Sequence, residues 1–172
     1  MKKLMILVLA LVCALTIVGC SIQEPASNAT AVPEDFTFAL TWNCYGISSY
    51  DSQTGKLVKT TDATNPDDYV TYYQLTDQDK EYIYNLIASL DVSSYPEAYD
   101  PQNGMSEPSM TLILTVGCNG TQKNIKAEKI ALSFTSEDEK GQAFLSVCKA
   151  ICNRLTATKE WKALPDYENI YK

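Results

Sequence analysis

Histidine is absent from this chain of 172 residues. Its imidazole is the base in Ser-His-Asp and Cys-His catalytic sites, and histidine is also the usual ligand of catalytic zinc. The absence excludes those classes of enzyme and metalloprotein. We therefore expect no catalytic residues, no metal site and no cofactor, and enzymatic activity is not the interpretation that we favour.

Basic side chains are also scarce. The sequence has 14 Lys and Arg against 21 Asp and Glu, a formal net charge of −7, and Arg154 is its single arginine. Nucleic acids are bound largely through contacts of Lys and Arg with phosphate groups. This balance of charge excludes a nucleic-acid partner and is typical of a protein kept soluble by its acidity.

The chain has an apolar run near its start, but a run long enough to span a membrane is lacking there. Residues 4–18 carry no charge and follow a basic start at Lys2 and Lys3. These residues are fewer than the roughly 20 that a membrane-spanning helix needs. A basic start, a short apolar core and small residues before a cleavage point are typical of a secretory signal peptide.

The apolar run ends at Ile17-Val18-Gly19-Cys20, which resembles the lipobox of bacterial lipoproteins. The resemblance covers residues 1–20 alone. It implies that the thiol of Cys20 takes a diacylglyceryl group and that a peptidase cuts between Gly19 and Cys20. The mature chain would then be lipid-anchored at the extracytoplasmic face of the cell membrane. An ordinary cleaved signal and an uncleaved short anchor are the alternatives.

The remaining sequence divides into two parts after the signal peptide of residues 1–19. Residues 20–35 begin with the cysteine to be lipidated and continue with small and polar residues interrupted by Pro25 and Pro33, as in a flexible tether. Residues 36–172 carry the periodic apolar patterns and are numerous enough for a single domain with a hydrophobic core.

The first part of the domain predicts strands followed by a helix. Apolar residues occupy the even positions of 36–44, which predicts a half-buried strand. Residues 52–55 predict a hairpin turn with Gly55 at a positive φ, and 69–75 is rich in the Tyr, Val and Thr that strands favour. Thr76 is the expected N-cap of a helix whose buried stripe is Ile83, Leu86, Ile87 and Leu90.

The clearest turn signal is Asn119-Gly120, because this pair is preferred in two-residue hairpins. Counting outward from the turn pairs Leu114 with Ile125. Beyond residue 127 the apolar residues shift from odd to even positions, and a side-chain period of two cannot absorb that shift. We therefore predict a β-bulge near Glu128-Lys129.

The last part of the domain predicts a long helix. Segment 91–109 contains three prolines and is expected to be a loop. Ser136 and Glu139 match a capping box, and the inner stripe of the helix that follows is Phe144, Cys148, Ile151, Cys152 and Leu155. A short helical piece is expected at 159–164.

Taken in the order ββ(β)-α-βββ-α, these elements predict an α+β fold. A single antiparallel sheet of about five to seven strands would carry the two main helices on one face.

Four cysteines follow Cys20, and the periodicities place all of them on inward faces: Cys44, Cys118, Cys148 and Cys152. They could be buried free thiols, or one could form a long-range disulfide with Cys44 outside the cytoplasm. A site of four thiolates is disfavoured because strong zinc motifs bring two close pairs. Cys148 and Cys152 are i, i+4 neighbours, too far apart to bridge each other without unwinding the helix.

Tyrosine is abundant, with 11 in the chain. Five of them gather around one predicted strand and the loop that comes later: Tyr69, Tyr72, Tyr73, Tyr95 and Tyr99. Tyrosine offers a broad contact area with a polar tip, which suits a surface that binds a protein or a carbohydrate. Tyrosine also packs at sheet edges because it favours strands, so both interpretations stay open.

Three classes of function follow from these observations. The first, which we favour, is a non-catalytic binding or interaction module that is anchored to the membrane through Cys20. The second is an inhibitor or protective protein that acts on an extracellular enzyme. The third is a histidine-free enzyme or a thiol redox protein that uses carboxylates or the pair Cys148 and Cys152.

Overall fold

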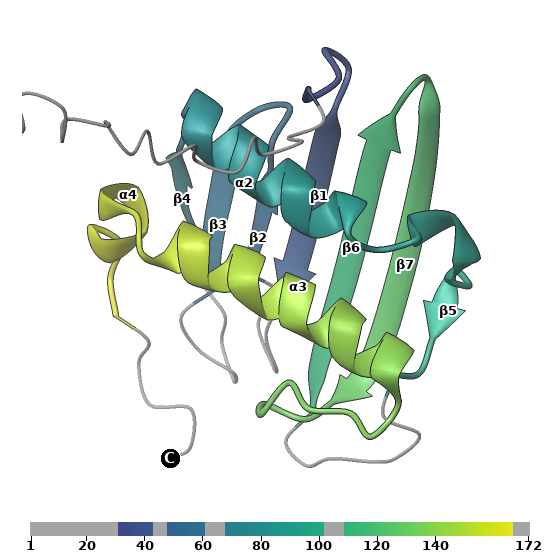
Figure 1. Cartoon of the computed structure of the whole chain (residues 1–172). Coiled ribbons are helices and arrows are strands. Elements are labelled where there is room, and N and C mark those ends of the chain that lie inside the picture. The colour runs from purple at the N-terminus through teal and green to yellow at the C-terminus, as the bar shows by residue number, and fades with distance from the viewer. Residues whose placement is uncertain (1–30, 43–47, 61–67, 102–108, 167–172) are drawn as a thin grey trace, which may run out of the picture.

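The computed structural model describes residues 31–42, 48–60, 68–101 and 109–166 (Figure 1). Gly19, Cys20 and Cys44 lie outside the described residues. The strands are β1 Thr37–Trp42, β2 Ser48–Asp51, β3 Lys56–Thr60, β4 Asp68–Tyr72, β5 Ala98–Tyr99, β6 Met110–Cys118 and β7 Thr121–Ile130. The helices are α2 Asp77–Ala88, α3 Glu139–Thr156 and α4 Lys159–Lys162, with a 3₁₀ helix η1 at Val92–Ser94.

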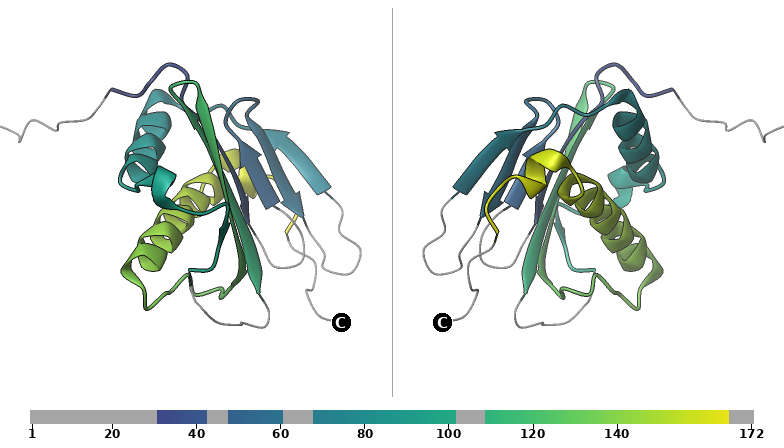
Figure 2. Two further views of the ribbon diagram at one scale, coloured as in Figure 1. Left: turned by 90° about the vertical axis from the view of Figure 1, so that its right-hand side faces the viewer. Right: turned by 90° about the vertical axis from the view of Figure 1, so that its left-hand side faces the viewer.

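The seven strands form one sheet in the order β4-β3-β2-β1-β6-β7-β5. Figures 1 and 2 show α2 and α3 on the same face of this sheet. The predicted α+β fold, with a single sheet and two main helices on one face, is therefore confirmed. β4 and β5 form the two edges of the sheet.

The short strand β5 corrects two details of the prediction. The sequence predicts a loop over 91–109 and an entirely antiparallel sheet, whereas this segment contains η1 and β5, and β5 runs parallel to β7. The other neighbouring strands pair antiparallel, so the sheet is mixed. A strand of two residues is too short to show an alternating pattern. It pairs because the chain returns along β7, where the N–H of Lys126 donates to the carbonyl of Glu97 at 2.7 Å.

The hydrophobic core lies between the sheet and the helices. The predicted alternation of the first strand is confirmed as far as Trp42, since Phe36, Phe38, Leu40 and Trp42 are all buried. β6 contributes its own alternate positions to the same cluster, and α2 and α3 close it from the other side.

The β2–β3 hairpin and β4 follow the predicted pattern. Gly55 ends the turn at φ 72°, and its N–H donates to the carbonyl of Asp51 at 2.8 Å. A side chain at this position would meet the amide of Gln74, so the turn requires glycine on two counts. β4 ends at Tyr72, short of the predicted end at 75, although the N–H of Tyr73 still donates to the carbonyl of Gly55.

The β6–β7 hairpin confirms its turn, its register and its bulge. Asn119 and Gly120 have φ angles of 52° and 69°, and Leu114 pairs with Ile125. Met110 pairs with Ile130 but Leu112 with Ala127, so β7 holds one extra residue between these pairs. Lys129 takes a φ of 60° at the predicted bulge.

Helix α2 begins as predicted. Thr76 is its N-cap and accepts a hydrogen bond from the N–H of Asp79 at 3.1 Å. Ile83 and Ile87 are buried along its inner face, Leu90 is buried just past its end, and Leu86 packs against the core from a half-buried position. The apolar stripe read from the sequence is therefore the face that meets the sheet.

Helix α3 confirms its buried stripe but corrects its cap. Phe144, Cys148, Ile151, Cys152 and Leu155 are all buried. The N-cap is Asp138 rather than Ser136, and its carboxylate accepts from the N–H of Gly141 at 2.7 Å. The hydroxyl of Ser136 donates instead to the carbonyl of Pro101, which joins the loop before α3 to the segment that follows β5. The short helix predicted at 159–164 is α4.

Among the described residues, none of the helices combines the length and the apolar character that crossing a membrane would demand.

Candidate functional site

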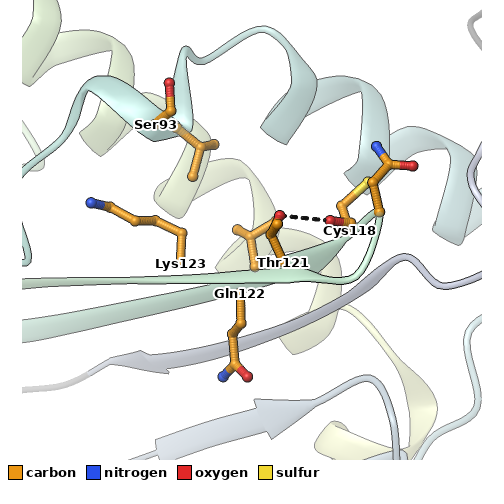
Figure 3. Close-up of a pocket in the computed structure, with 8 residues that line it drawn as sticks. Ser93, Cys118, Thr121, Gln122 and Lys123 are labelled. Atoms are coloured by element: carbon orange, nitrogen blue, oxygen red, sulfur yellow. Dashed lines mark hydrogen bonds between the residues drawn. The ribbon is translucent and has the colours of Figure 1, made fainter.

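The candidate site is a pocket of about 420 Å³ between η1 and the end of the β6–β7 hairpin (Figure 3). Ligand pockets commonly have volumes of about 300–1,000 Å³. The lining residues come from η1, from the end of β6, from the turn and from the start of β7: Val92, Ser93, Val116, Cys118, Asn119, Thr121, Gln122 and Lys123.

The alternation of the hairpin decides which side chains enter this pocket. Val116 pairs with Lys123 and Cys118 with Thr121, so these four positions share the helix-bearing face of the sheet. Gln122 lies between them in sequence, and Figure 3 shows it extending from the opposite side of the strand. The pocket therefore has an apolar wall of Val92 and Val116 with a polar rim around it.

The turn beside the pocket is held by hydrogen bonds. The carboxylate of Asp35 accepts from the N–H of Gly120 at 2.7 Å, and backbone hydrogen bonds from Gly120 and Asn119 lower the pKa of Asp35. The hydroxyl of Thr121 donates to the carbonyl of Cys118 at 2.8 Å (Figure 3). The chain that leads into β1 is thus fastened to the end of the hairpin.

Lys123 supplies the positive charge of the pocket. No ion pair of Lys123 occurs among the described residues, whereas Lys126 of the same strand pairs with Glu128 at 2.8 Å. Lys123 is half-buried as a residue, and a lysine next to an apolar wall can attract an anionic group that carries an apolar part. Sequence reasoning missed this site because neither η1 nor its position over the hairpin leaves a periodic signal.

A second hollow of about 300 Å³ lies on the other face of the sheet, near the same end. Its lining is mainly polar and includes Thr37, Asp51, Thr115 and Gln122. Part of this polar surface is internally bonded, because Asp51 accepts from the N–H of Gln53 and from the hydroxyl of Thr54, both at 2.9 Å. The hollow is smaller than the hairpin pocket and has no lysine in its lining.

The five tyrosines singled out by the sequence do not form one surface. Tyr69 and Tyr72 belong to β4 and Tyr73 follows it, whereas Tyr95 and Tyr99 lie beside β7 at the opposite edge of the sheet. Tyr72 is 64% exposed. Tyr95 is buried and Tyr99 is half-buried, and both pack against Phe144 with ring centroids 5.6 and 5.5 Å away.

A buried carboxylate forms a network that the sequence did not reveal. Asp79 is 3% exposed and accepts hydrogen bonds from Tyr73, from Thr76 at 2.7 Å and from the Nε of Arg154 at 2.5 Å. A terminal nitrogen of Arg154 forms an ion pair with the same oxygen that accepts from Nε. The network joins the end of β4, the first turn of α2 and the last turns of α3. The sequence predicts Asp79 only as one of the acidic residues in the first turn of a helix. It does not predict the contact with Arg154.

The electrostatics of this network indicate a structural role. Burial opposes the ionisation of Asp79, but the hydrogen bonds from Tyr73, Thr76 and Arg154 outweigh it and lower its pKa. Burial and the hydrogen bond to Asp79 raise the pKa of Tyr73 to about 12. A carboxylate that stays ionised and is surrounded by donors is poorly suited to acid–base catalysis at neutral pH.

Three of the four domain cysteines are described, and all three are free: Cys118, Cys148 and Cys152. Burial raises the pKa of the Cys148 thiol far above its ordinary value and that of Cys152 to about 12. Because the thiolate is the reactive form, these two thiols are weak nucleophiles. Cys118 is half-buried at the hairpin pocket. The predicted pairing of a cysteine with Cys44 stays a prediction, since Cys44 lies outside the described residues.

Within the described ranges, no group of three or more acidic or cysteine side chains is arranged to hold a metal ion. No protein-family model matches this chain, and a search of curated proteins found no significant relative.

Proposed function

We propose that this protein is a non-catalytic binding module anchored at the extracytoplasmic face of the cell membrane, and that its hairpin pocket is the ligand site. The ligand class that fits the pocket is a small molecule, or the end of a larger one, that combines an apolar group with an anionic group. The observation that carries the binding role is Lys123 beside the apolar wall of Val92 and Val116.

The anchor is supported by the sequence Ile17-Val18-Gly19-Cys20. Two acyl chains on one cysteine give stable attachment, because each buried CH₂ contributes about 0.8 kcal/mol. An anchored binding module needs no catalytic group of its own. Among the groups described above, hydrogen bonds lower the pKa of Asp79, and burial raises the pKa of the Cys148 and Cys152 thiols.

The pocket is tested with benzoate as the probe and benzyl alcohol as its neutral counterpart. Benzoate should shift the backbone amide resonances of Thr121 and Lys123 in an NMR titration of the full chain. Lys123→Gln should weaken benzoate binding about fivefold, since an exposed charge interaction contributes roughly 1 kcal/mol. Benzyl alcohol should bind both forms of the protein equally.

The matched control is Lys126→Gln, which removes a lysine from the same strand but from the opposite face of the sheet. It should leave benzoate binding unchanged. Equal loss in the two variants, or benzoate shifts that avoid the hairpin end, would contradict the assignment of the pocket.

A further inference from the structure

The two edges of the sheet differ in how they are protected against pairing with another chain. At one end the edge strand is β5, which has only two residues, and β7 beside it carries three lysines and contains the bulge at Lys129. Lysines, bulges and covering segments are the devices with which natural proteins protect a sheet edge.

Among the described residues, the β4 edge shows none of these three devices. The sequence of β4 is DYVTY, without lysine or proline. It pairs with β3 in one regular register, and no other described strand pairs with its free side. Figure 1 shows β4 as the last strand at its end of the sheet. Two of its side chains are also exposed, Val70 at 45% and Tyr72 at 64%. An exposed apolar edge of this kind is a template for strand pairing.

The hydrogen bonds show which backbone groups of β4 point outward. The N–H of Tyr73 donates to the carbonyl of Gly55, on the side of β3, at 2.8 Å. Residues of an antiparallel pair alternate in direction, so residues 69 and 71 also bond toward β3. The N–H and carbonyl groups of Val70 and Tyr72 therefore point away from the sheet.

We propose that β4 pairs with the β4 strand of a second copy of this chain, antiparallel and with Val70 on the two-fold axis. This register pairs the whole of Asp68–Tyr72 with itself and joins two sheets into one. The outward N–H and carbonyl groups of Val70 meet those of Val70 of the second copy. Such an isologous contact is the commonest form of association between identical chains.

The side chains fit this occupant because apolar positions meet apolar positions. Val70 pairs with Val58 of β3, which is 9% exposed, and both lie on the face of the sheet opposite to the buried Leu57. In the two-fold register, valines from four neighbouring strands form one continuous row across the dimer. Cross-strand contacts between β-branched residues stabilise such a pairing.

The strand is also self-complementary in register. The register matches the strand with itself along its whole length, because position 68 of one copy pairs with Tyr72 of the other and Tyr69 pairs with Thr71. An unrelated extended peptide would have no built-in match to this pattern.

The first experiment is cysteine cross-linking of the full chain in detergent. Val70→Cys should give a covalent dimer under mild oxidation, because Cα atoms about 5.5 Å apart in a hydrogen-bonded pair lie within disulfide range. The control is Leu132→Cys, which places a thiol at a side chain that is 53% exposed and lies past the end of β7. It should give no more dimer than the unmodified chain with its native thiols.

The second experiment is sedimentation equilibrium. Val70→Pro removes only an outward donor, so the β3–β4 pairing should persist while the dimer dissociation constant rises about tenfold or more. Val70→Lys places like charges opposite each other on the axis and should act in the same direction. Val70→Ile should associate like the unmodified chain.

Circular dichroism melting tests whether each variant is folded. If Val70→Pro does not fold, the dissociation constant of Val70→Lys decides the proposal. A chain that stays monomeric at its highest soluble concentration would overturn the proposal. A dimer that tolerates both Val70→Pro and Val70→Lys would overturn it too, because the contact would then lie on another surface.

Discussion

Arg154 is the single arginine of the chain, and its position explains much of how the helices are held to the sheet. Its guanidinium contacts Asp79, which lies at the start of the other main helix and also accepts from Tyr73. Arg154 also lies over the ring of Tyr82, with the guanidinium carbon 5.9 Å from the ring centroid. One residue therefore connects α3, α2 and the end of β4.

Replacing this arginine should destabilise the fold through the carboxylate that it leaves behind. Removal of one partner of a fully buried pair costs about 3–5 kcal/mol. The side chain of Arg154 is 45% exposed, so water screens part of the loss and we expect about 1–2 kcal/mol for Arg154→Ala. Urea unfolding measures the change, and Lys162→Ala on the exposed side of α4 serves as the control. A loss no larger than that of the control would show that the pair contributes little.

The same carboxylate predicts a pH dependence. The folded-state pKa of Asp79 is lowered from 3.8, so its contribution to stability is present above that value and is lost as the pH falls through the folded pKa. Asp79→Asn should therefore reduce the slope of the unfolding free energy against pH, between about pH 5 and the pH at which the protein unfolds in acid. Identical acid slopes for the two proteins would contradict the network as described.

At the scale of elements, the helices and strands that carry a periodic pattern of apolar residues could be predicted from the sequence. The stripe of α3, the alternation from Phe36 and the bulge beside Glu128 each follow from the spacing of apolar residues. β5 and η1 could not be predicted, because they are short and owe their positions to packing against β7 and the core. The cap at Asp138 differed from prediction because Ser136 is engaged by Pro101, a contact 35 residues away in sequence.

The candidate site was less predictable than the fold. Nothing in the sequence singles out Lys123 from the other lysines until the register places it beside Val116 and under η1. The tyrosines show the converse, a surface that the sequence suggested and the structure does not form. Their closeness in sequence suggested a common surface, but the strand order places Tyr72 and Tyr99 at opposite edges of the sheet.

The bulge gives a prediction for β7. Lys129 holds a φ of 60°, which costs a residue with a Cβ roughly 1–2 kcal/mol. Lys129→Gly should relieve that cost and raise the unfolding free energy by up to about 1 kcal/mol. Lys126→Gly, at a regular position of the same strand, should lower it by about 0.5–1 kcal/mol. Thermal unfolding of both variants measures the contrast. A lower melting temperature for Lys129→Gly would show that its side chain is needed at the bulge.

At the scale of the whole molecule, the proposed anchor and the proposed ligand site occupy the same end. The described chain enters beside the β6–β7 turn (Figure 1), where Asp35 bonds to Gly120. The hairpin pocket opens next to this turn. A lipid on Cys20 would therefore tether the domain from the pocket end, at a distance set by the residues between Cys20 and Asp35.

The anchor is tested on native membranes. Cys20→Ser should move the protein from the membrane fraction to the soluble fraction or leave its precursor uncleaved, and the intact mass should lack a diacylglyceryl adduct. Cys13→Ser changes a cysteine of the apolar run outside the lipobox-like stretch and should leave both fractionation and mass of the mature chain unaltered. A native chain that still begins at Met1 and carries no lipid would refute the anchor.

The fastening of Asp35 to the hairpin has a mechanical consequence. Any pull transmitted along the N-terminal segment reaches β1, which begins two residues later and sits between β2 and β6. Such a load acts along β1. The hydrogen bonds to β2 and to β6 must then break together by shear, and not one at a time. Shear of two ladders at once needs more force than the opening of single hydrogen bonds, so β1 is well placed to bear a load that arrives through Asp35.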